Sequence, residues 1–143
     1  MTCHLLDVNV LIALVDPAHV EHERAHGWFA RIGVKSFATC PITQNGLLRI
    51  VGHPKYPNSP GPPSRVAAAL TAICALDGHY FWPDSISIVS GEWIDTSLLS
   101  SHSRVTDSYL LALARANRGY LATLDQKLSS EAITDGASSL MLI

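Results

Sequence analysis

The sequence predicts an α/β fold in which helices cover both faces of a mostly parallel, twisted sheet. Short apolar segments alternate with helical patterns along the chain, which is typical of right-handed βαβ units. The 143 residues are 48% hydrophobic, enough for one domain with a sizeable core. Only 15% of the residues are charged, which argues against a disordered chain or a coiled coil.

The first third of the chain is expected to form two strands and three helices. In order, these are a strand at 4–6, a helix at 8–15, an amphipathic helix at 19–31, a strand at 36–39 and a helix at 42–51. Asp16 and Pro17 stop the first helix, because proline cannot continue it. Pro41 opens the third helix, at a position where proline is well tolerated.

A proline-rich segment separates these elements from the rest. Residues 52–64 contain five prolines and predict an irregular loop. The elements expected after it are a helix at 65–76, an edge strand at 80–83, a helix at 107–118, and strands at 120–124 and 140–143. Ser64 and Thr106 are the expected N-caps of the two helices. With no internal repeat and no linker between domains, residues 1–143 are expected to be a single domain.

The charge and cysteine content narrow the function and the compartment. Ten Lys and Arg against 12 Asp and Glu give a net charge of −2, which argues against general basic binding of nucleic acid. A nuclease with an acidic, metal-loaded site stays open. Cys3, Cys40 and Cys74 make neither a disulfide framework nor a zinc signature. We expect a cytoplasmic protein, since we see no membrane-spanning segment and no signal peptide.

Three aspartates stand at positions where an α/β fold gathers ligands. Asp7 and Asp125 follow predicted strands, and Asp107 begins a predicted helix. Each of them alone is more often a simple helix cap. Together they are expected to meet at the carboxyl edge of the sheet, where they would repel one another unless a cation neutralised them. Oxygen ligands without thiols favour Mg²⁺ or Mn²⁺.

Four segments of the chain resemble PIN-domain ribonucleases. They are LLDVNVL at 5–11, TCPIT at 39–43, VTDSYLLALA at 105–114 and LATLD at 121–125. The segment NGLLRI at 45–50 is similar to the VapC-type toxins of type II toxin–antitoxin systems. The resemblance covers essentially the whole chain, with the segments in the right order.

This resemblance implies a three-layer α/β/α sandwich with metal-dependent endoribonuclease activity. It assigns metal binding to Asp7, Asp107 and Asp125, and it makes Asn9 and Thr106 polar helpers that orient a carboxylate or a metal-bound water. A metal-activated water would then attack an RNA phosphodiester in line. The resemblance also implies a protein antitoxin as partner and a homodimer.

One residue departs from the family pattern. The family usually has Glu after its Cys-Pro-x-x block, where this chain has Gln44. A glutamine oxygen can still ligate Mg²⁺ but adds no charge, so Gln44 is expected to belong to the site and to bind metal more weakly. The departure leaves open a catalytically weakened PIN domain that acts mainly as a protein- or RNA-binding partner. A PIN nuclease of RNA processing, outside any toxin pair, stays open as well.

Two other functional classes need motifs that the sequence does not contain. A haloacid-dehalogenase phosphatase would need Asp-x-Asp where the chain has Asp7-Val8-Asn9, and a nucleotide-binding module would need a glycine-rich phosphate loop that the chain lacks. Four cationic or imidazole side chains are candidates for contact with substrate phosphate, although each can equally be plain surface. They are Arg49, Lys55, His102 and Arg104.

Overall fold

Five parallel strands form one sheet in the computed structural model, which describes residues 2–143. The strands run in the order β3-β2-β1-β4-β5, and every neighbouring pair is parallel. Their bounds are β1 His4–Leu6, β2 Phe37–Thr39, β3 His79–Phe81, β4 Tyr120–Thr123 and β5 Leu140–Leu142. The predicted parallel sheet, with β3 at one edge, is therefore confirmed.

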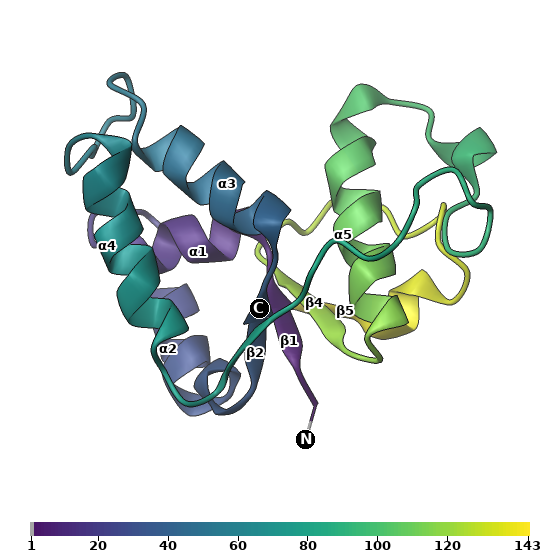
Figure 1. Cartoon of the computed structure of the whole chain (residues 1–143), viewed down its shortest axis with the longest axis horizontal. Helices are drawn as coiled ribbons and strands as arrows, with labels where there is room; N and C mark the ends of the chain where they lie inside the picture. The colour runs from purple at the N-terminus through teal and green to yellow at the C-terminus, as the bar shows by residue number, and fades with distance from the viewer. Residues whose placement is uncertain (1) are drawn as a thin grey trace.

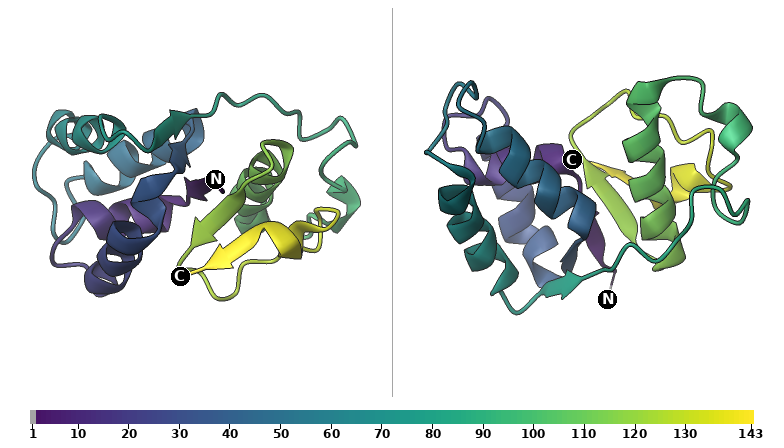
Figure 2. Two further views of the ribbon diagram at one scale, coloured as in Figure 1. Left: turned by 90° about the horizontal axis from the view of Figure 1, so that it is seen from below. Right: turned by 45° about the horizontal axis from the view of Figure 1, so that its top comes forward.

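Helices lie on both sides of this sheet (Figures 1 and 2). Four of them gather on one side, namely α1 Val8–Val15, α2 His22–Arg31, α3 Pro41–Val51 and α4 Pro63–Cys74. The fifth, α5 (Val105–Ala116), lies on the other side and packs against β4 and β1. Single 3₁₀ turns occur at Gly33–Lys35, Thr96–Leu98, His102–Arg104 and Gly136–Ser139.

Two apolar cores are built from alternate residues of the strands. Leu5 and Leu121 pack on the α5 side of the sheet, whereas Leu6 and Ala122 pack on the side of the other helices. This alternation follows from the two-residue period of a strand, which sends neighbouring side chains to opposite faces. All four side chains are fully buried. The result is the predicted three-layer α/β/α sandwich.

Both predicted helix caps were wrong. Helix α4 begins at Pro63, and Pro62 is its N-cap, so Ser64 lies inside the helix. Proline at the first helical position has its backbone angle already set and lacks an N–H that would go unpaired there, which explains the earlier start. Helix α5 begins at Val105 because the 3₁₀ turn before it leads directly into the helix, and Thr106 therefore caps nothing.

The proline-rich loop is tied to the end of α1. Asp16, which is only 4% exposed, accepts hydrogen bonds from the Tyr56 hydroxyl and the Asn58 amide. The same carboxylate also accepts the backbone N–H of Ala18 at 3.0 Å. The loop thus lacks regular structure but is fixed at its middle.

The longest helices, α4 and α5, have 12 residues each. Across residues 2–143, no helix combines the length and the apolar character needed to cross a membrane.

Candidate active site

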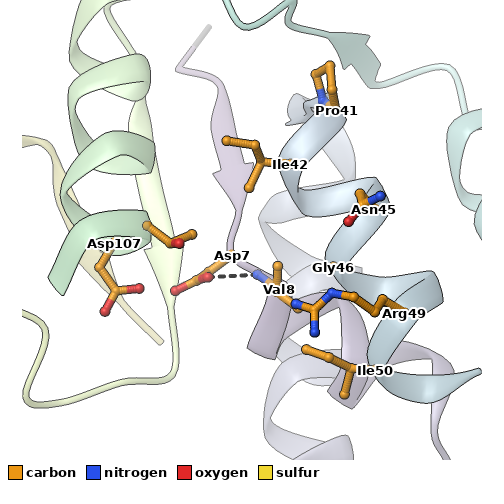
Figure 3. Close-up of a pocket in the computed structure, with 10 residues that line it drawn as sticks. Asp7, Val8, Pro41, Ile42, Asn45, Gly46, Arg49, Ile50 and Asp107 are labelled. Atoms are coloured by element: carbon orange, nitrogen blue, oxygen red, sulfur yellow. Dashed lines mark hydrogen bonds between the residues drawn. The ribbon is translucent and has the colours of Figure 1, made fainter. Parts of the chain in front are cut away.

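A cavity of about 470 Å³ lies at the carboxyl end of β1, between α3 and the first turn of α5 (Figure 3). One wall carries Asp7, Thr106 and Asp107. The opposite wall is α3, and Val8 lies beside Asp7. The residues of the α3 wall are Pro41, Ile42, Asn45, Gly46, Arg49 and Ile50. The expectation that Asp7 and Asp107 meet at this edge of the sheet therefore agrees with the structure.

Asp7 is fixed by hydrogen bonds at both carboxylate oxygens. It is the N-cap of α1, where its Oδ1 accepts the Val8 N–H at 2.7 Å, and its Oδ2 accepts the Thr123 hydroxyl at 2.8 Å. The side chain is buried, with 6% exposure. Burial raises the pKa of Asp7, the two hydrogen bonds lower it by less, and the nearby charge of Asp125 raises it further. Asp7 is both a helix cap and a constrained acid in the cavity.

Asp107 lies in the first turn of α5, across from Asp7 and half-buried. Burial raises the pKa of Asp107 to about 6, and the charges of Asp7 and Asp125 add to the effect. The charges of Asp7 and Asp125 are thus close enough to disfavour the ionisation of Asp107, as happens where carboxylates share one site.

Asp125 lies at the edge of this arrangement. It follows β4 by two residues, is exposed, and accepts the Lys127 N–H at 2.9 Å, but it does not line the cavity. Within residues 2–143, no three His, Cys, Asp or Glu side chains are arranged to hold a metal ion. The structure therefore brings two of the three expected ligands into one cavity and the third to its vicinity.

The donors nevertheless fit a hard divalent cation. The ionisable side chains at the acidic wall are carboxylates, and no thiol or imidazole lines the cavity. Oxygen donors of this kind suit Mg²⁺ or Mn²⁺. Burial, and after it the charges of neighbouring aspartates, raise the pKa values of Asp7 and Asp107, and a divalent cation would offset both effects.

Thr123 joins the separate parts of the acidic wall. Its hydroxyl donates to Asp7 and accepts hydrogen bonds from the Asn9 amide at 3.2 Å and from the Asp125 N–H at 3.1 Å. The oxygen of Asn9 accepts the N–H of Leu124 at 3.2 Å. Asn9 thus reaches the carboxylates through Thr123. Thr123 was not predicted to belong to the site, although its position at the end of a strand, two residues before Asp125, was a usable signal.

Gln44 lies outside the cavity, although the sequence predicts it to belong to the site. Its amide donates to the Thr39 hydroxyl at 3.0 Å and lies near the Cys74 sulfur, and it does not line the cavity. Helix geometry explains this, because Gln44 is turned about 200° from both Ile42 and Gly46 around the axis of α3. None of the α3 residues that line the cavity is acidic. The polar and small residues at this part of the α3 wall are Asn45 and Gly46.

Of the four candidates for contact with substrate phosphate, one lies at the cavity and three do not. Arg49 lines the cavity, whereas Lys55, His102 and Arg104 do not. Arg104 forms an ion pair with Glu131. Thr106 lines the cavity beside Asp107, where its hydroxyl can reach a ligand.

Known proteins similar to this chain are VapC ribonucleases. A family profile described as "PIN domain" matches residues 4–132. The chain is 43% identical over 132 residues to ribonuclease VapC44 of Mycobacterium tuberculosis, and the match covers 90% of each protein. It is 42% identical over 128 residues to ribonuclease VapC39 of the same organism, with 90% of this chain and 92% of VapC39 covered.

Two solved structures have a similar fold. Mycobacterium tuberculosis VapC20, described as a toxin that cleaves the sarcin–ricin loop, matches with a TM-score of 0.65 and 14% identity over 92% of this chain and 97% of its own. VapBC2 from Rickettsia felis, bound to a DNA fragment from the promoter, matches with a TM-score of 0.62 and 15% identity. The match covers 99% of this chain and 98% of the VapBC2 chain. At these identities the likeness concerns the fold.

Proposed function

Since this chain belongs to the PIN-domain family, as a ribonuclease toxin of the VapC type, we propose that it cleaves RNA with a divalent metal ion held by Asp7, Asp107 and Asp125. The observation that carries the proposal is the cavity in which Asp7 and Asp107 face one another with raised pKa values. Acids held in this way at a sheet edge weaken the fold unless they bind a cation. Their arrangement is therefore better explained by metal binding than by helix capping alone.

The side chains of the acidic wall have separate roles in this proposal. The carboxylates of Asp7, Asp107 and Asp125 would hold Mg²⁺ or Mn²⁺, and the bound ion would supply positive charge for the phosphodiester and for the attacking water. The hydrogen bonds from Val8 and Thr123 hold Asp7 in one orientation. Asp107, with a pKa of about 6, is ionised at neutral pH and presents its charge to the cation. The Thr106 hydroxyl lies on the same wall and can donate a hydrogen bond to a phosphate oxygen.

The test is cleavage of total RNA by the purified protein in Mn²⁺, Mg²⁺ or EDTA. We expect cleavage with either metal, none in EDTA, and a loss of at least a hundredfold in Asp7→Asn. Cleavage that is equal in EDTA, or equal in folded Asp7→Asn, would contradict the proposal.

Gln44→Glu adds a carboxylate on the side of α3 that faces away from the cavity, and it serves as the control for Asp7→Asn. Because the Gln44 amide points to Thr39 and not into the cavity, we expect the cleavage rate of Gln44→Glu to stay within about threefold of the native rate. A native protein that is silent while Gln44→Glu cleaves RNA would favour the weakened, binding-only alternative and would contradict the placement of Gln44.

We also propose the assembly in which the protein acts. It would be a single PIN domain over residues 1–143, a homodimer in the cytoplasm, and the partner of a protein antitoxin. The VapBC2 complex, whose fold is similar, supports the antitoxin partner. Light scattering of the purified protein tests the dimer, for which we expect twice the chain mass of 15.4 kDa.

A further inference from the structure

The wall of the cavity opposite the acids has a chemistry of its own. We infer that the α3 wall binds one nucleotide of the RNA beside the cleaved bond, with Arg49 on a phosphate and Asn45 at the edge of the base. Pro41 and Ile42 would provide the apolar surface under that base. This inference rests on the proposed function and adds to it the residues that position the substrate.

Helix α3 is packed tightly enough to place this wall next to the acids. The residues Ile42, Asn45, Gly46 and Arg49 share one face of the helix, because they are spaced by three and four positions. A Cβ atom at Gly46 would lie 2.9 Å from Cγ2 of Val8, the residue after Asp7. Glycine therefore permits the close approach of α3 to α1 and adds no side chain to the cavity.

Arg49 brings a positive charge to the cavity without neutralising the acids. Its side chain extends from α3 toward Val8 and Asp7 (Figure 3). None of the ion pairs found within residues 2–143 includes Arg49. The charge thus faces the acids across a space, and a planar guanidinium is well suited to fill such a space with a bidentate phosphate contact.

The rest of the wall suits a base. Pro41, Ile42 and Ile50 are apolar, and the exposed Asn45 carries both a donor and an acceptor on one amide. In single-stranded RNA recognition, bases stack on aromatic or arginine side chains and are hydrogen-bonded along their edges. Here Pro41 and Ile42 offer an aliphatic surface in place of an aromatic one, and the Asn45 amide can bond the edge of the base. The cavity volume of about 470 Å³ falls within the range of roughly 300–1,000 Å³ that small-ligand pockets occupy.

The experiment compares three variants on a random-sequence, single-stranded RNA pool with Mn²⁺, where the cleaved ends are sequenced. Arg49→Gln removes the phosphate contact, Asn45→Ala removes the base contact, and Lys55→Gln is the control. Lys55 is an exposed cation outside the cavity, so it reports any general effect of charge. All three positions are exposed, and the melting temperature of each variant confirms that it is folded.

The two contacts predict different results. For Arg49→Gln we expect KM to rise at least tenfold for every sequence, with a smaller change in kcat. In the Asp7→Asn background, binding to the RNA pool is measured at several salt concentrations. Arg49→Gln should make the slope of log K against log salt concentration shallower by about 0.7, the value for one phosphate contact with a single strand. Asn45→Ala should lose the preference for one base beside the cut while total cleavage stays within about tenfold. Lys55→Gln should match the native protein.

Two results would overturn the inference while leaving the nuclease intact. One is an equal KM for Arg49→Gln and Lys55→Gln, and the other is an unchanged base preference in Asn45→Ala. A native protein that does not cleave RNA with any metal would instead contradict the proposed function, and with it this inference.

Discussion

Thr123 is the residue on which the geometry of the acidic wall depends. It is fully buried, and its one hydroxyl links Asp7, Asn9 and the Asp125 backbone. Thr123→Val keeps the shape of the side chain but leaves the Asn9 amide and the Asp125 N–H without this acceptor and Oδ2 of Asp7 without its donor. We expect the free energy of unfolding to fall by about 1–3 kcal/mol, as for other buried groups that lose a partner, and the cleavage rate to fall at least tenfold.

Urea denaturation and the RNA cleavage assay check this expectation. Thr123→Ser is the control, because it keeps the hydroxyl and should retain most of the activity. A Thr123→Val protein as active and as stable as Thr123→Ser would show that the hydroxyl is not needed.

The raised pKa of Asp107 predicts how the stability of the protein without metal changes with pH. The pKa of about 6 in the folded protein exceeds the ordinary value of 3.8, so the folded state holds a proton that the unfolded state has lost between these values. Stability without metal should therefore fall as the pH rises from about 4 to about 6 and stay reduced at pH 7. Asp107→Asn should remove this loss and raise the free energy of unfolding at pH 7 by about 1 kcal/mol, a value reduced for partial exposure.

The measurement is urea denaturation of both proteins in EDTA at pH 4 and pH 7. The free energy of unfolding of Asp107→Asn should exceed that of the native protein at pH 7, and the two values should be nearly equal at pH 4. A variant that is less stable than the native protein at pH 7 would have the wrong sign for a repelled carboxylate.

Individual site residues could be predicted where the ends of strands and the starts of helices fix them. Asp7 follows β1 and Asp107 lies in the first turn of α5, and both line the cavity, because the helix that leads into a parallel strand starts near the carboxyl edge of the sheet. The sequence placed Gln44 wrongly, because the direction of a side chain on α3 depends on how the helix packs. On α3, Gly46 lies so close to Val8 that an added Cβ would come within 2.9 Å of Val8 Cγ2, and a single sequence does not reveal this packing.

At the scale of elements, α1 and the loop after α3 are held together by Asp16. The buried carboxylate receives the hydroxyl of Tyr56, and burial and this hydrogen bond raise the pKa of Tyr56 to about 12. Tyr56→Phe removes that donor but leaves Asn58 in place. We expect a loss of about 1.5–3 kcal/mol in the free energy of unfolding, as for a hydrogen bond to a charged group, and faster amide exchange in residues 52–62.

Hydrogen exchange followed by mass spectrometry tests this expectation. Tyr80→Phe is the matched control, because the Tyr80 side chain is 56% exposed and lies at the edge of the sheet. Equal exchange of the loop in both variants would mean that Asp16 does not hold it.

The bounds of the elements could be predicted where proline and strand composition decide them. Asp16 and Pro17 marked the end of α1, and the short apolar runs marked β1 and β2 to within one residue. The predicted starts of α4 and α5 were each two residues late. Helix α4 begins at Pro63 and α5 continues directly from a 3₁₀ turn, so neither helix needs the capping side chain that the prediction relied on. Short 3₁₀ turns depend on tertiary contacts and leave little trace in the sequence.

At the scale of the whole molecule, the acidic site lies where the two cores meet. Strand β1 contributes Leu5 to one core and Leu6 to the other, and Asp7 follows at once. The cost of burying the ionised Asp7 therefore acts on the strand that lies between both layers of helices, and a cation that offsets this cost should stabilise the entire fold. A ligand at 100 times its Kd adds about 2.7 kcal/mol to the free energy of unfolding.

The thermal unfolding of the protein with and without Mn²⁺ tests the metal site most directly, since it needs no knowledge of the RNA target. In millimolar Mn²⁺ we expect the melting temperature of the native protein to rise by several degrees, with the rise reversed by EDTA. Glu92→Gln, which removes an exposed acid outside the cavity, should show the same rise. Asp7→Asn should show none. An equal rise in Asp7→Asn, or no rise in the native protein, would contradict a metal site at the carboxyl end of β1.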